Sequence, residues 1–177
     1  MFYSGVIIHY KPASMQRFAV IFTQNWYLNL HSWQKELIQI AIELYSREER
    51  MHSSFTDYSF IVFPMAKAYE GFLKQYFYNM GLIDERTYND KRFRIGRALN
   101  PDLDPSRRDD QWMYGRIMEM CGVHVARQLW DTWLQCRNQV FHYFPANEKR
   151  LSLIEAGKYL ELMATTIEQA AACQLAV

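Results

Sequence analysis

Residues 137–142, which read Arg-Asn-Gln-Val-Phe-His, carry the side-chain types that phosphate chemistry needs. An imidazole takes up and releases a proton near neutral pH, and a guanidinium holds phosphate oxygens through paired hydrogen bonds. On a helix, Asn138 and His142 share a face, so the amide can reach the imidazole and fix its tautomer. Arg137 would lie about 140° from His142, so the two would flank a groove that fits one phosphate. The pattern predicts acid–base chemistry at a phosphate ester. The alternative is that the two cations only stabilise the helix, because positive charges near a helix C-terminus interact favourably with the helix dipole.

A basic run is the second candidate site. It holds four cations within seven residues and no acid: Lys91, Arg92, Arg94 and Arg97. Cations at this density bind RNA phosphates. The run can instead be a solvated loop, balanced by the acids that follow it: Asp102, Asp104, Asp109 and Asp110. The adjoining Ile95-Gly96 pair predicts a tight turn.

Several other kinds of chemistry are excluded. The chain has no glycine-rich phosphate loop, no G-x-S-x-G elbow and no H-E-x-x-H, which removes nucleotide hydrolysis, esterase chemistry and zinc proteolysis. Cys121 and His124 lack the further ligands that a metal site requires, so we predict neither metal nor cofactor. Three cysteines without a C-x-x-C pair, Cys121, Cys136 and Cys173, predict reduced core thiols and no disulfide framework.

The elements that position these residues are predicted to be helices of one compact domain. Only 7 glycines and 5 prolines occur in 177 residues, which favours long elements with few turns. Apolar spacing and capping residues predict an all-α antiparallel bundle of four to five helices. The expected helices span residues 32–50, about 57–80 with Pro64 inside, 106–121, 123–143 and 149–172.

Particular residues set the details of these helices. Ser32 and Ser106 are the expected N-caps of the first and third helices. The buried face of the first helix is predicted from four residues spaced three or four apart: Trp33, Leu37, Ile40 and Leu44. The spacing of Trp130, Trp133 and Phe141 predicts core positions, so they receive no role in the site.

The first thirty residues differ from the rest and are predicted to be a separate N-terminal arm, ahead of a helical domain over residues 31–177. Residues 5–10 and 18–23 are short β-branched and aromatic runs, which fit a small β hairpin or an extended arm. A buried helical segment is the alternative, because periodicity does not decide such short runs.

Charge and hydropathy limit the partners and the location. The formal net charge is +1, so any nucleic-acid site must be local. No stretch reaches the roughly 20 apolar residues of a spanning helix, and no secretory signal is visible at the start. We therefore predict a cytoplasmic protein with no membrane partner.

The Arg-Asn-x-x-x-His pattern late in a small helical bundle resembles the motif of HEPN-domain ribonucleases. Residues 63–74, followed by Gly81-Leu82-Ile83, are similar to the early catalytic-domain helix of RNase LS toxins (the RnlA/LsoA family), which carries a functional glutamate. Glu70 falls at that position. The resemblance covers about residues 58–163, and it implies that residues 31–177 form a HEPN-like helical domain.

The resemblance implies metal-independent cleavage of RNA through attack of the 2′-hydroxyl on the adjacent phosphorus. His142 would act as general base or acid, Arg137 would stabilise charge on the phosphoryl oxygens, and Asn138 and Glu70 would orient the site. It also implies a homodimer that joins two motifs and an inhibitory protein antitoxin. The hypothesis is an endoribonuclease (a hydrolase) of toxin or phage-defence type; the alternative is a non-catalytic HEPN-like protein-interaction module.

Overall fold

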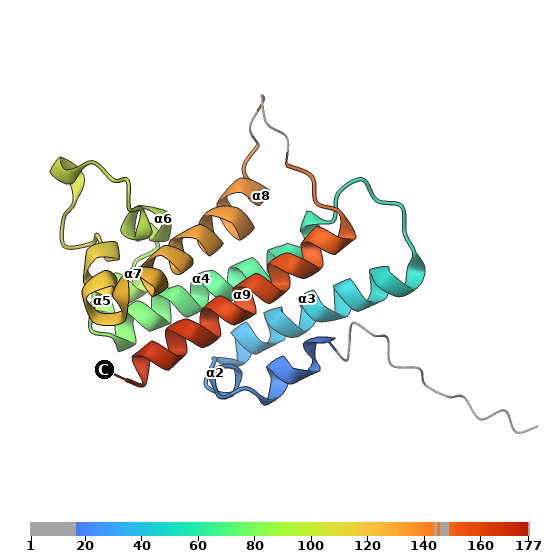
Figure 1. Cartoon of the computed structure of the whole chain (residues 1–177), viewed down its shortest axis with the longest axis horizontal. Coiled ribbons are helices and arrows are strands. Elements are labelled where there is room, and N and C mark those ends of the chain that lie inside the picture. Colours follow the sequence, from blue (N-terminus) through green and yellow to red (C-terminus); the bar gives the residue numbers. More distant parts are fainter. Residues whose placement is uncertain (1–16, 144, 146–148, 177) are drawn as a thin grey trace, which may run out of the picture.

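The computed structural model describes residues 17–143, 145 and 149–176, and its architecture is a bundle of long helices. The long helices are α3 (Ser32–Met51), α4 (Ser59–Asn79), α7 (Tyr114–Trp133) and α9 (Leu153–Gln174). Helix α4 packs against α3, α9 and α7, so it lies at the centre of the bundle (Figure 1). The described residues contain no strand, which confirms the predicted all-α class.

Short helical elements connect the long ones. They are η1 (Val20–Thr23), α2 (Asn25–Leu28), α5 (Glu85–Asn89), α6 (Ile95–Leu99), η2 (Pro105–Arg107), the π-helical turn η3 (Leu134–Asn138) and α8 (Gln139–Phe141). The segment that carries α5, α6 and η2 forms a lobe at one end of the bundle (Figure 1). Gly96 therefore lies within helix α6, and the predicted tight turn is wrong.

The prediction of a β strand over residues 18–23 is also wrong. These residues are helical, and Phe18 and Ile21 are buried in the same core cluster as the bundle. Trp26 and Tyr27 of α2 join that cluster. An apolar run of this length satisfies either conformation, and its burial against the bundle decides for the helix. The other run, residues 5–10, lies outside the described residues.

Helix α3 forms where the sequence predicts it, but its buried face is rotated. The side chains of Trp33 and Ile40 are 54% and 42% exposed, whereas Leu37 and Ile38 are buried. The N-cap is His31 rather than Ser32, and the His31 N–H donates to the Gln34 side chain at 2.9 Å. The predicted face is thus confirmed at Leu37 and at Leu44, which packs against the core, and is wrong at Trp33 and Ile40.

Helix α7 begins later than the sequence predicts and continues through an interruption. Ser106 lies in the short η2 element, so it does not cap the long helix, which begins at Tyr114. Gly122 has φ 85° and ψ 160°, so the backbone leaves the helical region there and α7 consists of two helical segments joined at a kink, which confirms Gly122 as the predicted separator. Only glycine adopts this backbone conformation at little cost. The chain past the kink continues through η3 to the end of α8 at Phe141.

A polar junction fixes the start of α4 to the start of α9. Asp57 Oδ1 accepts hydrogen bonds from the backbone N–H of Ser59 and of Leu151, at 3.0 and 3.1 Å. The Tyr58 N–H donates to the Leu151 carbonyl at 2.9 Å. Ser152 then caps α9 in a reciprocal pair with Glu155. The junction therefore fixes the position at which the chain rejoins the bundle after the loop that follows His142.

Cys121 and Cys173 form a disulfide, which corrects the prediction of reduced thiols. Their Cα atoms are 5.8 Å apart although 52 residues separate them in the chain, because α7 and α9 pack together. Sequence spacing alone does not show such a contact. Cys136 is a free, buried thiol, as expected. Within the described part of the chain, no helix has the length and apolar character needed to cross a bilayer.

Candidate active site

A chain of contacts brings Glu70, Arg137 and His142 together. Arg137 Nε lies 2.8 Å from Glu70 Oε1, and Arg137 Nη1 lies 3.2 Å from His142 Nε2. The ion pair is partly exposed, with each side chain about a third accessible. These three residues were singled out from the sequence. They meet at one place although Glu70 and His142 are 72 positions apart in the chain.

The direct contact between Arg137 and His142 depends on an irregular helix end. On a regular α-helix the two side chains would diverge, as expected from their spacing in the sequence. The chain instead passes through the π turn η3 and leaves helix α8 at Phe141, and His142 is extended with φ −105° and ψ 135°. The imidazole can then turn back to Arg137. The predicted gap between the two side chains is therefore replaced by a contact.

The contact also defines the imidazole's protonation pattern. A guanidinium only donates hydrogen bonds, so Nε2 must accept and the ring proton resides on Nδ1. To act as a general base, Nε2 must exchange this hydrogen bond for one from the hydroxyl that it deprotonates. Asn138 lines the same groove as His142, and its role in fixing this tautomer stays a prediction.

Trp133 supports both partners of the ion pair. Its Nε1 donates to Glu70 Oε1 at 3.3 Å, and the Arg137 guanidinium lies 5.9 Å from the centre of its ring. The indole is buried and stacks on Trp130 at 5.6 Å, so the predicted core position is confirmed. Its contacts with the site were not predicted from the sequence, although the spacing of four residues between Trp133 and Arg137 was a usable signal.

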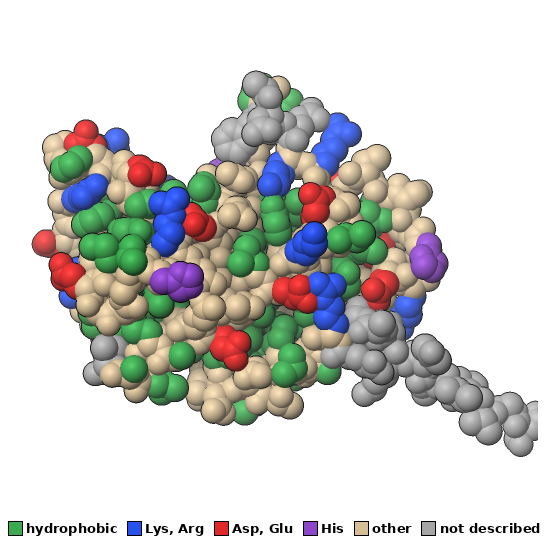
Figure 2. All heavy atoms as spheres, viewed as in Figure 1, with side chains coloured by type: hydrophobic (Ala, Val, Ile, Leu, Met, Phe, Trp, Pro, Cys, Tyr) green, Lys and Arg blue, Asp and Glu red, His purple; other side chains and the backbone are tan. Residues whose placement is uncertain are grey.

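The contact chain lies in a groove of about 860 Å³. Helix α4, the α6 lobe and the η3 turn form its walls, and a notch separates the α6 lobe from the α8 end in Figure 2. Its lining includes two carboxylates, Glu70 and Asp90, against seven cationic side chains. The cationic residues are Lys67, Lys74, Lys91, Arg94, Arg97, Arg107 and Arg137. A chain of net charge +1 thus concentrates an excess of five positive charges in one groove.

The basic run predicted from the sequence divides into two groups. Lys91, Arg94 and Arg97 line the groove, whereas Arg92 is exposed outside its lining. Among the described residues, no carboxylate lies within ion-pair distance of Lys91 or Arg94. The groove therefore presents two cations from this run that have no anionic partner in the described structure.

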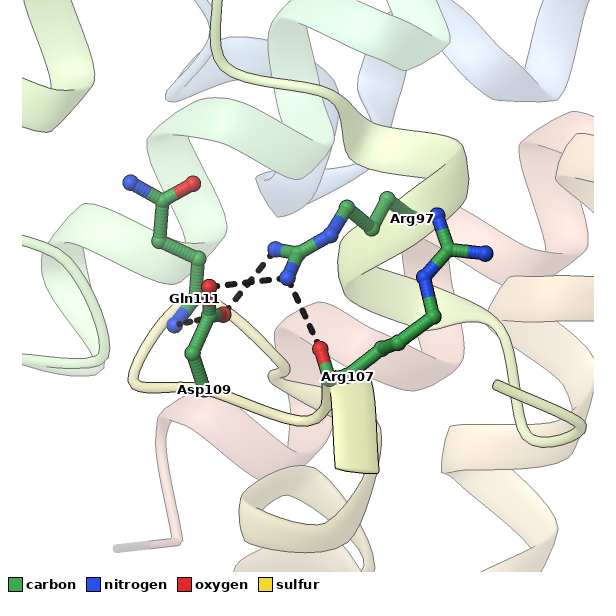
Figure 3. A network of polar contacts seen from close by, with 4 residues as sticks. All are labelled: Arg97, Arg107, Asp109 and Gln111. Atoms are coloured by element: carbon green, nitrogen blue, oxygen red, sulfur yellow. Dashed lines mark hydrogen bonds and ion pairs between the residues drawn. The ribbon is translucent and has the colours of Figure 1, made fainter. Parts of the chain in front are cut away.

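Arg97 has a structural partner instead. Its two Nη atoms lie 2.9 and 2.8 Å from the two carboxylate oxygens of Asp109, and Nη2 also donates to the Arg107 carbonyl at 2.8 Å. Figure 3 shows the Arg97 guanidinium against Asp109, while the Arg107 side chain points away from that carboxylate. Hydrogen bonds from Arg97 hold the pKa of Asp109 below its usual range. Asp109 is one of the acids that were expected to balance the basic run, and it neutralises Arg97.

The arrangement joins a proton acceptor, a fixed cation and a carboxylate at the edge of a basic groove. Such a set can deprotonate a hydroxyl and stabilise negative charge on a phosphoryl oxygen. In the part of the chain that the structure describes, no three His, Cys, Asp or Glu side chains gather as metal ligands. Comparisons of the chain with protein-family models, with curated proteins and with solved structures found no match.

Proposed function

We propose that this protein is a metal-independent endoribonuclease with a HEPN-like bundle, of the toxin or phage-defence type, working in the cytoplasm. The observation that carries the proposal is the position of the Arg137 guanidinium, which bridges Glu70 and His142 inside a groove rich in cations. A phosphodiester bound there would meet a base and a charge-stabilising group at the same point. The basic groove supplies the attraction for a polyanion that the net charge does not.

In the proposed reaction, His142 Nε2 takes the proton of the ribose 2′-hydroxyl, which then attacks the adjacent phosphorus. The new 2′-O–P bond replaces the P–O5′ bond, the departing 5′ oxygen takes up a proton from solvent, and His142 returns the proton that it took to solvent. The products are a 2′,3′-cyclic phosphate and a 5′-hydroxyl. Arg137 stabilises charge on the phosphoryl oxygens, and Glu70 and Asn138 orient Arg137 and His142. Lys91, Arg94 and the other cations of the groove bind the RNA.

A homodimer and a protein antitoxin belong to the same proposal. The aromatic side chains of Phe60 and Phe63 on α4 are 38% and 53% exposed, and Phe63 lines a hollow together with Glu70 and Arg137. Exposed aromatic side chains of this kind suit a protein interface. They also favour the second candidate function, a non-catalytic module in which this face binds a protein partner.

The test is cleavage of a labelled RNA in excess EDTA, with analysis of the product ends. The wild type should leave 2′,3′-cyclic or 3′-phosphate ends, and Arg137→Ala and His142→Ala should each lower the rate by about 100-fold or more. His124→Ala is the matched control, because His124 is an exposed histidine on α7 outside the groove.

If folded wild type does not cut RNA after any copurifying protein is removed, the enzyme proposal fails. The interaction module then becomes the better account of the same face. Equal loss of activity in His124→Ala would also contradict the proposed roles, because the effect would not depend on the groove.

A further inference from the structure

The contact of Arg137 with Glu70 and His142, which we call the reactive contact, lies where two hollows of the surface meet. Lys67, Glu70 and Arg137 line the large groove, and the same three residues line a second hollow of about 220 Å³. The rings of Phe63 and Phe141 line the second hollow only. The surface is therefore open on both sides of the Glu70–Arg137 pair, and a bound chain can continue in either direction.

Two lysines of α4 stand on opposite sides of this pair. Lys67 precedes Glu70 by three residues and Lys74 follows it by four, and all three side chains face the groove. Seven residues of helix separate the lysines by about 10 Å. Lys67 lies at the junction of the two hollows, and Lys74 lies further along the groove, on the wall that Lys91 and Arg94 complete.

Neither lysine is neutralised by a carboxylate. Glu70 is occupied by Arg137, and no acid among the described residues lies within ion-pair distance of Lys67 or Lys74. The Lys67 ammonium lies 5.3 Å from the centre of the Trp33 ring, and the Lys74 ammonium donates to the Asp90 carbonyl at 2.9 Å. Each contact orients a cation without cancelling its charge.

We infer that two phosphate-binding subsites flank the reactive contact, one at Lys67 and one at Lys74 with Lys91. The inference rests on the proposed function and names what its substrate must contain, which is a charged linkage on each side of the linkage that is cut. A mononucleotide or a chain end fills only one subsite. An internal linkage of a single strand fills both, so the site selects the interior of a strand.

The test uses a short DNA strand with a single ribonucleotide, which fixes the cleaved linkage because only that sugar has a 2′-hydroxyl. Two further strands carry an uncharged methylphosphonate at the linkage before or after the cleaved one. For the wild type, each neutral linkage should lower kcat/KM by about fivefold, the size of one exposed ion pair. Standard RNA is cleaved in parallel as the measure of the basic activity.

The variants connect each linkage to its lysine. Lys67→Ala should lose sensitivity to the neutral linkage on one side only, and Lys74→Ala/Lys91→Ala should lose sensitivity only to the one on the other side. Lys158→Ala, an exposed lysine of α9 outside the groove, should behave as the wild type. Thermal unfolding of each variant checks that the fold is retained.

The outcomes separate this inference from the function on which it rests. If the wild type cuts RNA but neither neutral linkage changes kcat/KM, the two subsites are rejected while the ribonuclease stands. The subsites are also rejected if each lysine variant slows all three strands equally, because the lysines would then act only through the general field of the groove. If the wild type does not cut standard RNA at all, both proposals fall.

Discussion

At Glu70, one carboxylate oxygen accepts from two donors, Arg137 Nε and Trp133 Nε1. The ion pair fixes the direction of the guanidinium, and the other edge of that guanidinium contacts His142. Glu70 therefore acts on the reaction through Arg137, as a positioning residue. A displacement of about 1 Å at such a contact costs up to about 100-fold in rate.

We predict that Glu70→Gln lowers kcat of RNA cleavage by about tenfold and leaves KM nearly unchanged. The amide keeps an oxygen for Trp133 but loses the charge that holds Arg137. The melting temperature should change little, because the pair is partly exposed. A variant that raised KM alone would show that Glu70 acts on RNA binding instead.

The residue types of the site could be predicted from the sequence, but their geometry could not. Arg137, His142 and Glu70 were singled out by their chemistry and by resemblance, and the structure brings them together. The contact between Arg137 and His142 depends on a π turn and on the end of the helix at Phe141. Tertiary packing decides such irregularities, and a helical period does not encode them.

At the scale of elements, α6 and the end of α7 are joined by a close approach at Gly96. A Cβ built on Gly96 would lie 2.2 Å from Cη2 of Trp133. The same indole contacts Glu70 and Arg137. The α6 lobe, which carries the cations of the basic run, therefore packs directly on the residue that supports the ion pair. Only a residue without a side chain fits there.

We predict that Gly96→Ala lowers the free energy of unfolding by about 1–3 kcal/mol, as expected for an overpacked contact. In a helix without such a contact, the same exchange raises stability by about 0.4–1 kcal/mol, so the sign of the change is informative. Urea unfolding at neutral pH measures it. A more stable Gly96→Ala variant would show that the lobe does not press on Trp133 in solution.

The junction between α4 and α9 predicts a dependence of stability on pH. Burial alone would raise the pKa of Asp57, but hydrogen bonds from the Leu151 backbone and from Ser59 outweigh it and lower the pKa below the ordinary 3.8. A carboxyl whose pKa is lowered by folding stabilises the fold above its unfolded pKa. That contribution is lost as the pH falls through the lower, folded value.

We therefore predict that Asp57→Asn destabilises the protein by about 1–2 kcal/mol at pH 7, with a smaller difference from wild type at pH 3. Urea unfolding at both pH values gives the two differences. Asp102→Asn, which changes an exposed acid for which no such junction exists, is the control. A difference between Asp57→Asn and wild type that did not shrink at pH 3 would contradict the assignment.

At the scale of the whole molecule, the helical class and four of its helices were predictable because the helical period is a local property. Contacts between distant parts of the chain were not. The exposed face of α3, the pairing of Glu70 with Arg137 and the pairing of Cys121 with Cys173 all depend on how the helices pack. The net charge of +1 likewise does not reveal that the fold gathers cationic side chains in one groove.

The disulfide gives the last prediction, because it closes a loop of 52 residues that contains η3, α8 and His142. A cross-link of this length restricts the unfolded chain and contributes about 4 kcal/mol in the chain-entropy account, with about 2–4 kcal/mol as the usual measured range. Reduction by dithiothreitol should lower the free energy of unfolding of the oxidised protein by that amount. Cys121→Ser/Cys173→Ser should match the reduced wild type and should not respond to the reductant, whereas Cys136→Ser should keep the full response. If the reductant leaves the wild type unchanged, the two thiols are not paired in solution, and the contact of α7 with α9 must be maintained by apolar packing and the buried hydrogen bond between Thr132 and Thr166.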